Sequence, residues 1–320
     1  PVAGAHDAGA RSDSGGHLIV WSFLGLDSTE GWTGITRRAF RGDLTTGTWT
    51  ELPPVPGQAG RLAATAQVVR GKVYLIGGYT VDSAGGERSV PEVDVWDPAT
   101  GSWSAAAPMP VPTDDVVSGV WRDSLIYIVS GWHDTDNVRD VQVYDPAADR
   151  WTAATPIPGP GVFGHTGGIV GDAIVYVDGV ARRPPGEQPR YMMVPQAWVG
   201  RIDPAETSRI AWSWLPEQPG SPTYRAAAAP CGDRLVFFGG TANPYNSNGV
   251  GYDGVPSEPS AFRFAWSATT GTWGDTLTAP VATMDHRALA LARSGAWVVG
   301  GMRSGQRVSA NVTAVPRPDC

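Results

Sequence analysis

The sequence predicts an all-β fold built from repeated units, and three observations support this prediction. The 320 residues include 41 Gly and 28 Pro, the two poorest helix formers, which would interrupt a helix every few residues. A hydrophobic content of 42% with 14 Trp supplies a packed core, which excludes a disordered chain. The third observation is an internal repeat with a period of about 50 to 60 residues.

Each repeat contains an apolar run that ends in small residues. A short apolar run bounded by glycine predicts a buried strand that stops at the glycine. The run recurs as VYLIGG at 73–78, LIYIVSG at 125–131, IVYVDG at 174–179, LVFFGG at 235–240 and AWVVGG at 296–301.

A second pattern recurs once in each of the first five units. An apolar strand leads into an Asp-Pro or Thr-Gly turn, and a Trp comes directly after the turn, at 43–49, 94–103, 142–151, 201–214 and 266–273. Asp-Pro and Thr-Gly favour tight turns, so the pattern predicts a hairpin whose outer strand carries the Trp. Proline-rich segments then connect each unit to the next.

These residues resemble the kelch repeat, with its double glycine and its hairpin Trp. The pairs Gly77-Gly78, Gly239-Gly240 and Gly300-Gly301 fit fully, and Leu24-Gly25, Ser130-Gly131 and Asp178-Gly179 are degenerate. The resemblance implies a six-bladed β-propeller, in which four-stranded blades surround a central channel. A single domain would span 1–320, with blades at about 1–57, 58–111, 112–158, 159–219, 220–280 and 281–320.

The sixth unit is short. After 311–315 the sequence has no outer strand with a Trp, whereas Pro1-Val2-Ala3 is similar to the stretch that follows the Trp strand in other units. We therefore expect the N-terminal residues to help close the last blade, or its outer strand to come from upstream of Pro1.

Ionisable residues gather where the innermost strand of each unit begins. These positions share a face with the loops after the glycine pairs and would form a ring around a concave channel mouth, the default place for a binding site. For each member, hydrogen bonding between blades is the alternative role. The ring comprises His6, Asp7, Arg61, Asp114, Asp115, His165, Tyr224, Arg225, Asp285, His286 and Arg287.

The residue types in this ring suggest acid/base chemistry on an anion. Arg61, Arg225 and Arg287 would hold a carboxylate or phosphate, with Asp115 and Tyr224 beside them. Proton transfer would fall to His165 or His286 together with Asp114 or Asp285. The leading hypothesis is a metal-independent isomerase or lyase that acts on a small acidic-sugar-like substrate. The alternatives are a non-catalytic carbohydrate- or protein-binding propeller and a glycoside hydrolase that uses paired Asp.

Three loops after the glycine pairs are longer than hairpins require, at 79–92, 180–198 and 241–262. Long loops in compact domains are often functional. Arg190, Tyr191 and Tyr245 are predicted substrate-binding residues that would wall a pocket over the mouth, and decoration without function is the alternative. The further polar and aromatic residues of these loops are Arg182, Arg183, Asn246, Asn248 and Tyr252.

We expect neither a metal nor a cofactor. The sequence lacks a GxSxG elbow, an HExxH motif and a phosphate-binding loop, and His133, Asp134 and Asp136 lack calcium-loop spacing. The kelch family includes copper radical oxidases, which need a Cys crosslinked to Tyr, but Cys231 falls in a predicted turn on the opposite face. The resemblance is closer to bacterial kelch proteins of the sialic-acid epimerase type, on blade number and an arginine-rich mouth.

Charge and hydropathy indicate the partners and the compartment. A net charge of −7 with Lys72 as the only lysine argues against nucleic-acid binding, and no apolar run is long enough to span a membrane. We expect a monomer with a small-molecule ligand, secreted or periplasmic after removal of a signal peptide. Cys231 and Cys320 form either one disulfide or two separate thiols.

Overall fold

The computed structural model describes residues 8–14, 17–286, 288–293 and 295–320. In these residues the fold is all-β, with six antiparallel sheets and a single short 3-10 helix, η1 (Trp32–Gly34). The first three sheets follow the chain in order. They contain β1 (Ala8–Ser14), β2 (His17–Phe23), β3 (Ala39–Asp43) and β4 (Thr48–Leu52); β5 (Thr65–Val69), β6 (Lys72–Ile76), β9 (Val93–Asp97) and β10 (Ser102–Ala106); and β11 (Val117–Trp121), β12 (Leu125–His133), β13 (Asp136–Asp145) and β14 (Arg150–Ala154).

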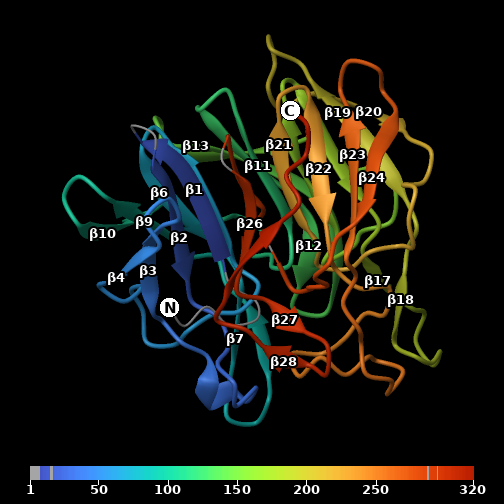
Figure 1. The fold of residues 1–320 in the computed structure, drawn as a ribbon, viewed down its shortest axis with the longest axis horizontal. Coiled ribbons are helices and arrows are strands. Elements are labelled where there is room, and N and C mark those ends of the chain that lie inside the picture. Colours follow the sequence, from blue (N-terminus) through green and yellow to red (C-terminus); the bar gives the residue numbers. More distant parts are fainter. Residues whose placement is uncertain (1–7, 15–16, 287, 294) are drawn as a thin grey trace.

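The second half of the chain forms the other three sheets. They contain β15 (Thr166–Val170), β16 (Ala173–Val177), β19 (Ala197–Ile202) and β20 (Ile210–Trp214); β21 (Ala227–Cys231), β22 (Arg234–Phe238), β23 (Phe262–Ser267) and β24 (Trp273–Thr278); and β25 (Ala290–Ala292), β26 (Gly295–Val299) and β29 (Val312–Val315). Three small hairpins lie together at one end of the molecule, opposite the C-terminus (Figure 1). They are β7 (Tyr79–Val81) with β8 (Glu87–Ser89), β17 (Val180–Arg182) with β18 (Tyr191–Met193), and β27 (Met302–Arg303) with β28 (Arg307–Val308).

The six sheets close into a ring. Their innermost strands contact one another in the order β1, β5, β11, β15, β21 and β25, and β25 contacts β1 again. Six clusters of buried apolar side chains fill the spaces between neighbouring sheets. The structure is therefore a six-bladed propeller in a single domain, as the repeat predicted.

The hairpin Trp residues link neighbouring blades. The indole Nε1 of Trp103 donates to the Pro53 carbonyl 2.9 Å away, in the segment that leaves the previous blade. The equivalent bonds run from Trp151 to Ala107 O, from Trp212 to Thr155 O and from Trp273 to Pro216 O. The repeated Trp thus fixes four of the crossing segments with a hydrogen bond as well as with buried area.

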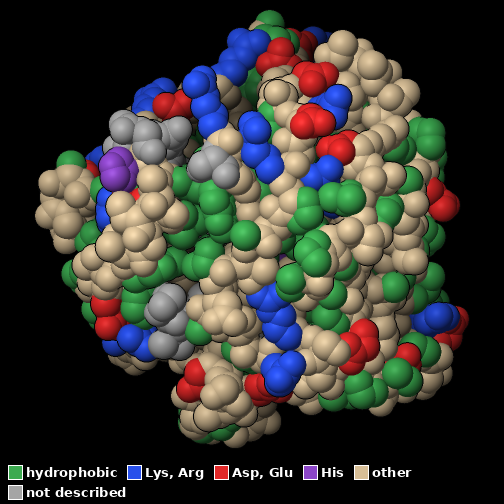
Figure 2. Space-filling model, in the orientation of Figure 1, with side chains coloured by type: hydrophobic (Ala, Val, Ile, Leu, Met, Phe, Trp, Pro, Cys, Tyr) green, Lys and Arg blue, Asp and Glu red, His purple; other side chains and the backbone are tan. Residues whose placement is uncertain are grey.

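The sixth sheet has three strands in the described part of the chain, where the others have four. Its outermost strand there is β29, with Val312 and Thr313 half-buried and Ala314 exposed. Apolar side chains gather near the middle of the face shown in Figure 2, where β26 lies in Figure 1. The expected closing residues Pro1, Val2 and Ala3 lie outside the described residues.

The two cysteines form a disulfide. Cys231 ends β21, and its bond to Cys320 ties the C-terminus to the fifth blade. Disulfides persist in oxidising compartments, so the bond points to such a compartment. In the part of the chain that the structure describes, no helix has the length and apolar character needed to cross a membrane.

The disulfide should contribute measurably to stability. Replacing Cys231 and Cys320 by Ala should lower the unfolding free energy by about 2–4 kcal/mol, because the bond closes a long loop in the unfolded chain. Denaturant unfolding of the variant against the oxidised protein measures the difference. Equal midpoints for the oxidised and reduced protein would show that the bond contributes nothing.

Candidate functional site

The same three-residue arrangement, which we call the axial triplet, precedes five of the inner strands. In each triplet the first residue forms a β-bridge with the residue that follows the glycine pair of the same blade. The second residue has a positive φ in all five. The triplets are 62–64, 114–116, 163–165, 224–226 and 284–286.

First-position side chains face the small hairpins. Asp114 is buried, and its Oδ2 accepts a 2.6 Å hydrogen bond from Ser89 Oγ on β8. Burial raises the pKa of Asp114 well above its usual range. Tyr224 is also fully buried, among the rings of Phe163 and Tyr245. The structure therefore places both predicted site residues in the packing beneath the loops.

Second-position residues form a chain of backbone hydrogen bonds around the axis. Each N–H donates to the second-position carbonyl of the preceding blade: Asp115 to Ala63 at 3.1 Å, Gly164 to Asp115 and Arg225 to Gly164 at 2.8 Å, and Asp285 to Arg225 at 3.0 Å. The left-handed backbone, with φ between 53° and 67°, makes this geometry possible and is costly for a residue with a Cβ.

The second-position side chains meet across the axis. Arg225 donates to both carboxylate oxygens of Asp115, two blades away, and its Nη1 lies 3.8 Å from Asp285 Oδ1. All three side chains are buried. The guanidinium also lies over the rings of Tyr224 and Tyr245, at 4.7 and 5.2 Å. The charges predicted to face a ligand at the mouth are thus largely paired with one another.

Third-position side chains pack beneath the second glycine of the pair. A Cβ on Gly78 would lie 3.0 Å from that of Ala64, and one on Gly179 would lie 2.7 Å from His165 Cβ. His165 Nε2 contacts the Val129 carbonyl at 2.9 Å, and His286 Nε2 contacts Thr283 Oγ1 at 2.5 Å. Both predicted catalytic histidines therefore occupy a position that Ala64, Val116 and Ala226 fill in other blades.

The remaining predicted binding residues do not lie together. Arg61 is buried and donates to Asp94 Oδ2 at 2.5 Å. Arg190 lies 5.2 Å above the ring of Tyr191 in the β17–β18 hairpin, whereas Tyr245 is fully buried. Arg287 lies outside the described residues, as do His6 and Asp7.

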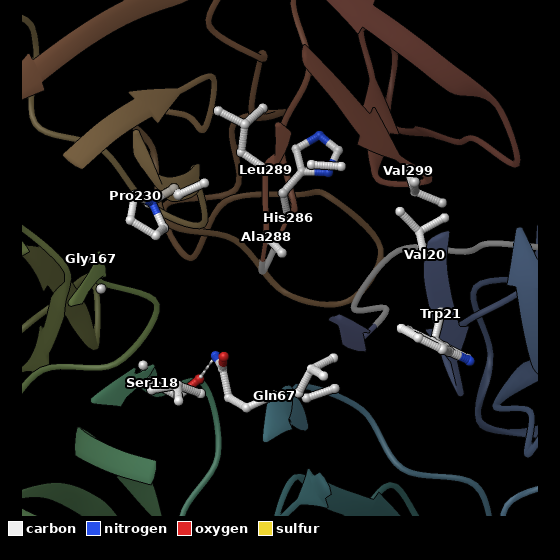
Figure 3. Close-up of a pocket in the computed structure, with 18 of the residues that line it drawn as sticks. Val20, Trp21, Gln67, Ser118, Gly167, Pro230, His286, Ala288, Leu289 and Val299 are labelled. Carbon is white, nitrogen blue, oxygen red and sulfur yellow. Dashed lines mark hydrogen bonds between the residues drawn. The ribbon is translucent and has the colours of Figure 1, made fainter. Parts of the chain in front are cut away.

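A cavity of about 360 Å³ occupies the axis on the other side of the charged network. Figure 3 shows side chains from all parts of the ring around this space. Its polar lining includes Ser22, Gln67, Ser118 and Asp285, and its far end reaches the exposed Pro230. Gln67 Nε2 donates to Ser118 Oγ at 2.8 Å. His286 also borders the cavity, but its imidazole points away from the space (Figure 3).

Sequence reasoning did not select Gln67 and Ser118. Both lie inside inner strands, where the apolar pattern gives no reason to choose a polar residue. Each is a polar side chain on a strand otherwise rich in Ala, Gly and Val. Aligning the equivalent inner strands of the repeats would have identified both residues. The described residues contain no group of three His, Cys, Asp or Glu that could hold a metal.

Asp178 is a buried carboxylate that the sequence analysis did not select as a site residue. It replaces the first glycine of the pair in the fourth blade and has a positive φ. Its Oδ2 accepts hydrogen bonds from Thr223 N at 2.8 Å and Gln218 Nε2 at 3.2 Å, which join the fourth blade to the fifth. Burial raises the pKa of Asp178 to about 7.

Comparisons with known proteins agree with this architecture. The family model described as "Kelch motif" matches residues 60–110, which hold the second blade with its glycine pair and hairpin Trp. The chain is a six-bladed β-propeller with a kelch motif in its second blade. A solved structure that it resembles is that of YjhT, with a TM-score of 0.74 and 16% sequence identity over 97% of this chain and 94% of that one. At this identity the likeness concerns the fold of the propeller.

Removing the central cation should destabilise the propeller strongly. Replacing Arg225 by Met leaves the Asp115 and Asp285 carboxylates buried together, so the unfolding free energy should fall by about 3–5 kcal/mol. The matched control is Arg122→Met, which removes the exposed ion pair with Asp172 and should cost about 1 kcal/mol or less. Denaturant unfolding measures both. A loss for Arg225→Met no larger than the control would contradict the central role of the network.

Asp178 should make stability depend on pH. Its pKa is about 7 in the folded protein, above its unfolded value, so the folded state holds an extra proton between pH 4 and 7. The unfolding free energy should therefore fall as the pH rises through this window, and level off above it. Asp178→Asn should abolish this pH-dependent fall, which amounts to roughly 2–4 kcal/mol. Urea unfolding of both proteins at pH 4.5 and pH 8 measures the fall in each. Parallel pH profiles would contradict the assignment.

Proposed function

We propose that the axial cavity binds a small, neutral, sugar-like molecule and that the propeller isomerises it by proton transfer. The observation that supports this most strongly is the cavity itself, whose volume of about 360 Å³ suits a monosaccharide. Hydroxyl and amide groups on its wall match the hydroxyls of a sugar, and small side chains leave room for the ring. Asp285 lies buried at its closed end.

The substrate class differs from the anion expected from the arginines. Arg61 and Arg225 donate to the buried carboxylates of Asp94 and Asp115, so neither offers an unpaired positive charge. Among the described residues that line the cavity, the ionisable side chains are Asp285 and His286, beside the polar Ser22, Gln67 and Ser118. The hydroxyls of a neutral sugar suit these polar groups.

Asp285 is the proposed proton carrier. Its carboxylate would take a proton from a hydroxyl or from a carbon next to a carbonyl of the substrate, and return it to a neighbouring atom, with no oxidant or reductant needed. An elimination or hydrolysis would need a second group to protonate the leaving atom. Asp114 faces the β7–β8 hairpin and Asp115 is held by Arg225, so the geometry favours an isomerase over a lyase or a glycoside hydrolase.

The compartment forms part of the same proposal. The Cys231–Cys320 disulfide supports a secreted or periplasmic protein, where free sugars are accessible. On the face shown in Figure 2, basic and acidic side chains are interspersed, and such a surface does not favour nucleic acid.

A panel of neutral aldoses and ketoses in D2O, followed by NMR, tests the function through deuterium incorporation or anomer exchange. Asp285→Asn should lower kcat by about a hundredfold or more while the sugar still binds. Asp94→Asn also breaks a buried Asp–Arg pair, away from the cavity, and should keep kcat. Thermal midpoints establish that both variants fold.

Three outcomes decide between the functions. Full activity of Asp285→Asn would remove this residue from the mechanism. Binding without turnover would overturn the enzymatic part and leave a carbohydrate-binding propeller. If no neutral sugar shifts the NMR spectrum of the protein, the proposed ligand class is wrong.

A further inference from the structure

A second cavity, of about 250 Å³, lies between the two longest loops, at the end of the molecule where the small hairpins gather. The loop between β16 and β19 contributes Arg183, Tyr191 and Met193, and the loop between β22 and β23 contributes Asn243 and Tyr252. We call this cavity the loop cleft. The axial cavity shares none of its lining residues, so the two are separate places for a ligand.

We propose that the loop cleft is a binding site for a small ring-shaped carboxylate, such as a uronic acid. The proposal is independent of the function assigned to the axial cavity. It rests on three features of the cleft: a partly exposed guanidinium, an aromatic wall, and an ionised carboxylate at the rim.

Arg183 supplies the positive charge. Its Nη1 makes one long, exposed contact of 3.4 Å with Glu187 Oε2. Its Nε is buried and has no hydrogen-bond partner within the described residues. The side chain as a whole is 33% exposed, so the guanidinium meets the cleft through its Nη side. A ligand carboxylate would pair with that exposed side through charge-assisted hydrogen bonds.

Two tyrosines supply the wall for a ring. The centroids of Tyr191 and Tyr252 lie 4.3 Å apart at an angle of 51°, and Tyr191 is further held edge-on by Trp132 and Phe163 at 5.6 and 5.5 Å. Rings fixed in this way lose little conformational entropy on binding. Their apolar faces suit the C–H face of a sugar ring.

Asp253 provides an acceptor for sugar hydroxyls. Its Oδ1 accepts bonds from Val255 N at 2.9 Å and Asn243 Nδ2 at 3.2 Å. The bond from the Val255 backbone, followed by that from Asn243, lowers the pKa of Asp253 below its usual value. The carboxylate therefore stays ionised and acts only as an acceptor. Cation, aromatic wall and acceptor together fit a ligand with a carboxylate, a ring and hydroxyls.

The test measures binding of glucuronate, glucose and acetate by calorimetry and by ligand-observed NMR. Glucuronate should bind more tightly than glucose, which lacks the carboxylate, and than acetate, which lacks the ring. Arg183→Gln should weaken glucuronate binding by about tenfold or more, because a charge-assisted pair is lost. Tyr252→Leu should weaken it by about threefold or more, whereas Tyr252→Phe, which keeps the ring, should change it less.

Arg182→Gln is the matched control. Arg182 is the adjacent arginine, and its Nη1 donates to the Thr135 carbonyl at 2.8 Å, so its loss should leave glucuronate affinity within about twofold. A second control is Ser118→Phe, which fills the axial cavity and should also leave glucuronate binding unchanged. Thermal midpoints confirm folding of each variant.

Three results would overturn the proposal. The first is no glucuronate binding, and the second is binding that Arg183→Gln and Arg182→Gln weaken equally. The third is loss of glucuronate binding in Ser118→Phe with retention in Arg183→Gln, which would place the ligand in the axial cavity. Failure of the isomerase assay does not affect these outcomes, because they measure binding at a different set of residues.

Discussion

The chain of backbone hydrogen bonds around the axis is the constraint on which the rest of the structure depends. Four bonds join the second residues of the five axial triplets, from Ala63 to Asp285, and fix how closely neighbouring inner strands approach. They require a left-handed backbone at each second residue, and this conformation turns its side chain towards the axis. The charge at the centre of the propeller is therefore set by a few positions, of which Asp115, Arg225 and Asp285 are ionisable.

The same geometry explains the glycine pairs and the histidines. Once the second residue is fixed, the third lies directly beneath the second glycine, where a Cβ on Gly78 or Gly240 would lie 2.7–2.8 Å from a first-position carbonyl oxygen. The third residue is free to vary as long as it packs between blades. Ala64 and His165 are equivalent solutions at this position, so the presence of a histidine there carries little information about catalysis.

The repeat predicted the fold because its signals are local: the strand before the glycine pair, the turn and the Trp all lie within one blade. The candidate site depended on contacts that no local pattern contains. Arg225 pairs with Asp115 across 110 residues of sequence, and the ring of charges expected at an open mouth is instead buried beneath Tyr224, Tyr245 and the loops. The position of these residues in the repeat predicts that they lie near the axis. Which of their charged groups can bind a ligand depends on the long-range pairing, which the repeat does not reveal.

The pairing also separates the ligand chemistry of the two cavities. Among the described residues, the network at the closed end of the axial cavity joins Arg225 to Asp115 and Asp285, so this guanidinium is already engaged by protein carboxylates. In the loop cleft, Arg183 contacts Glu187 at a long and exposed distance. The anion site that we propose therefore lies among the loops, and the sugar site that we propose lies on the axis.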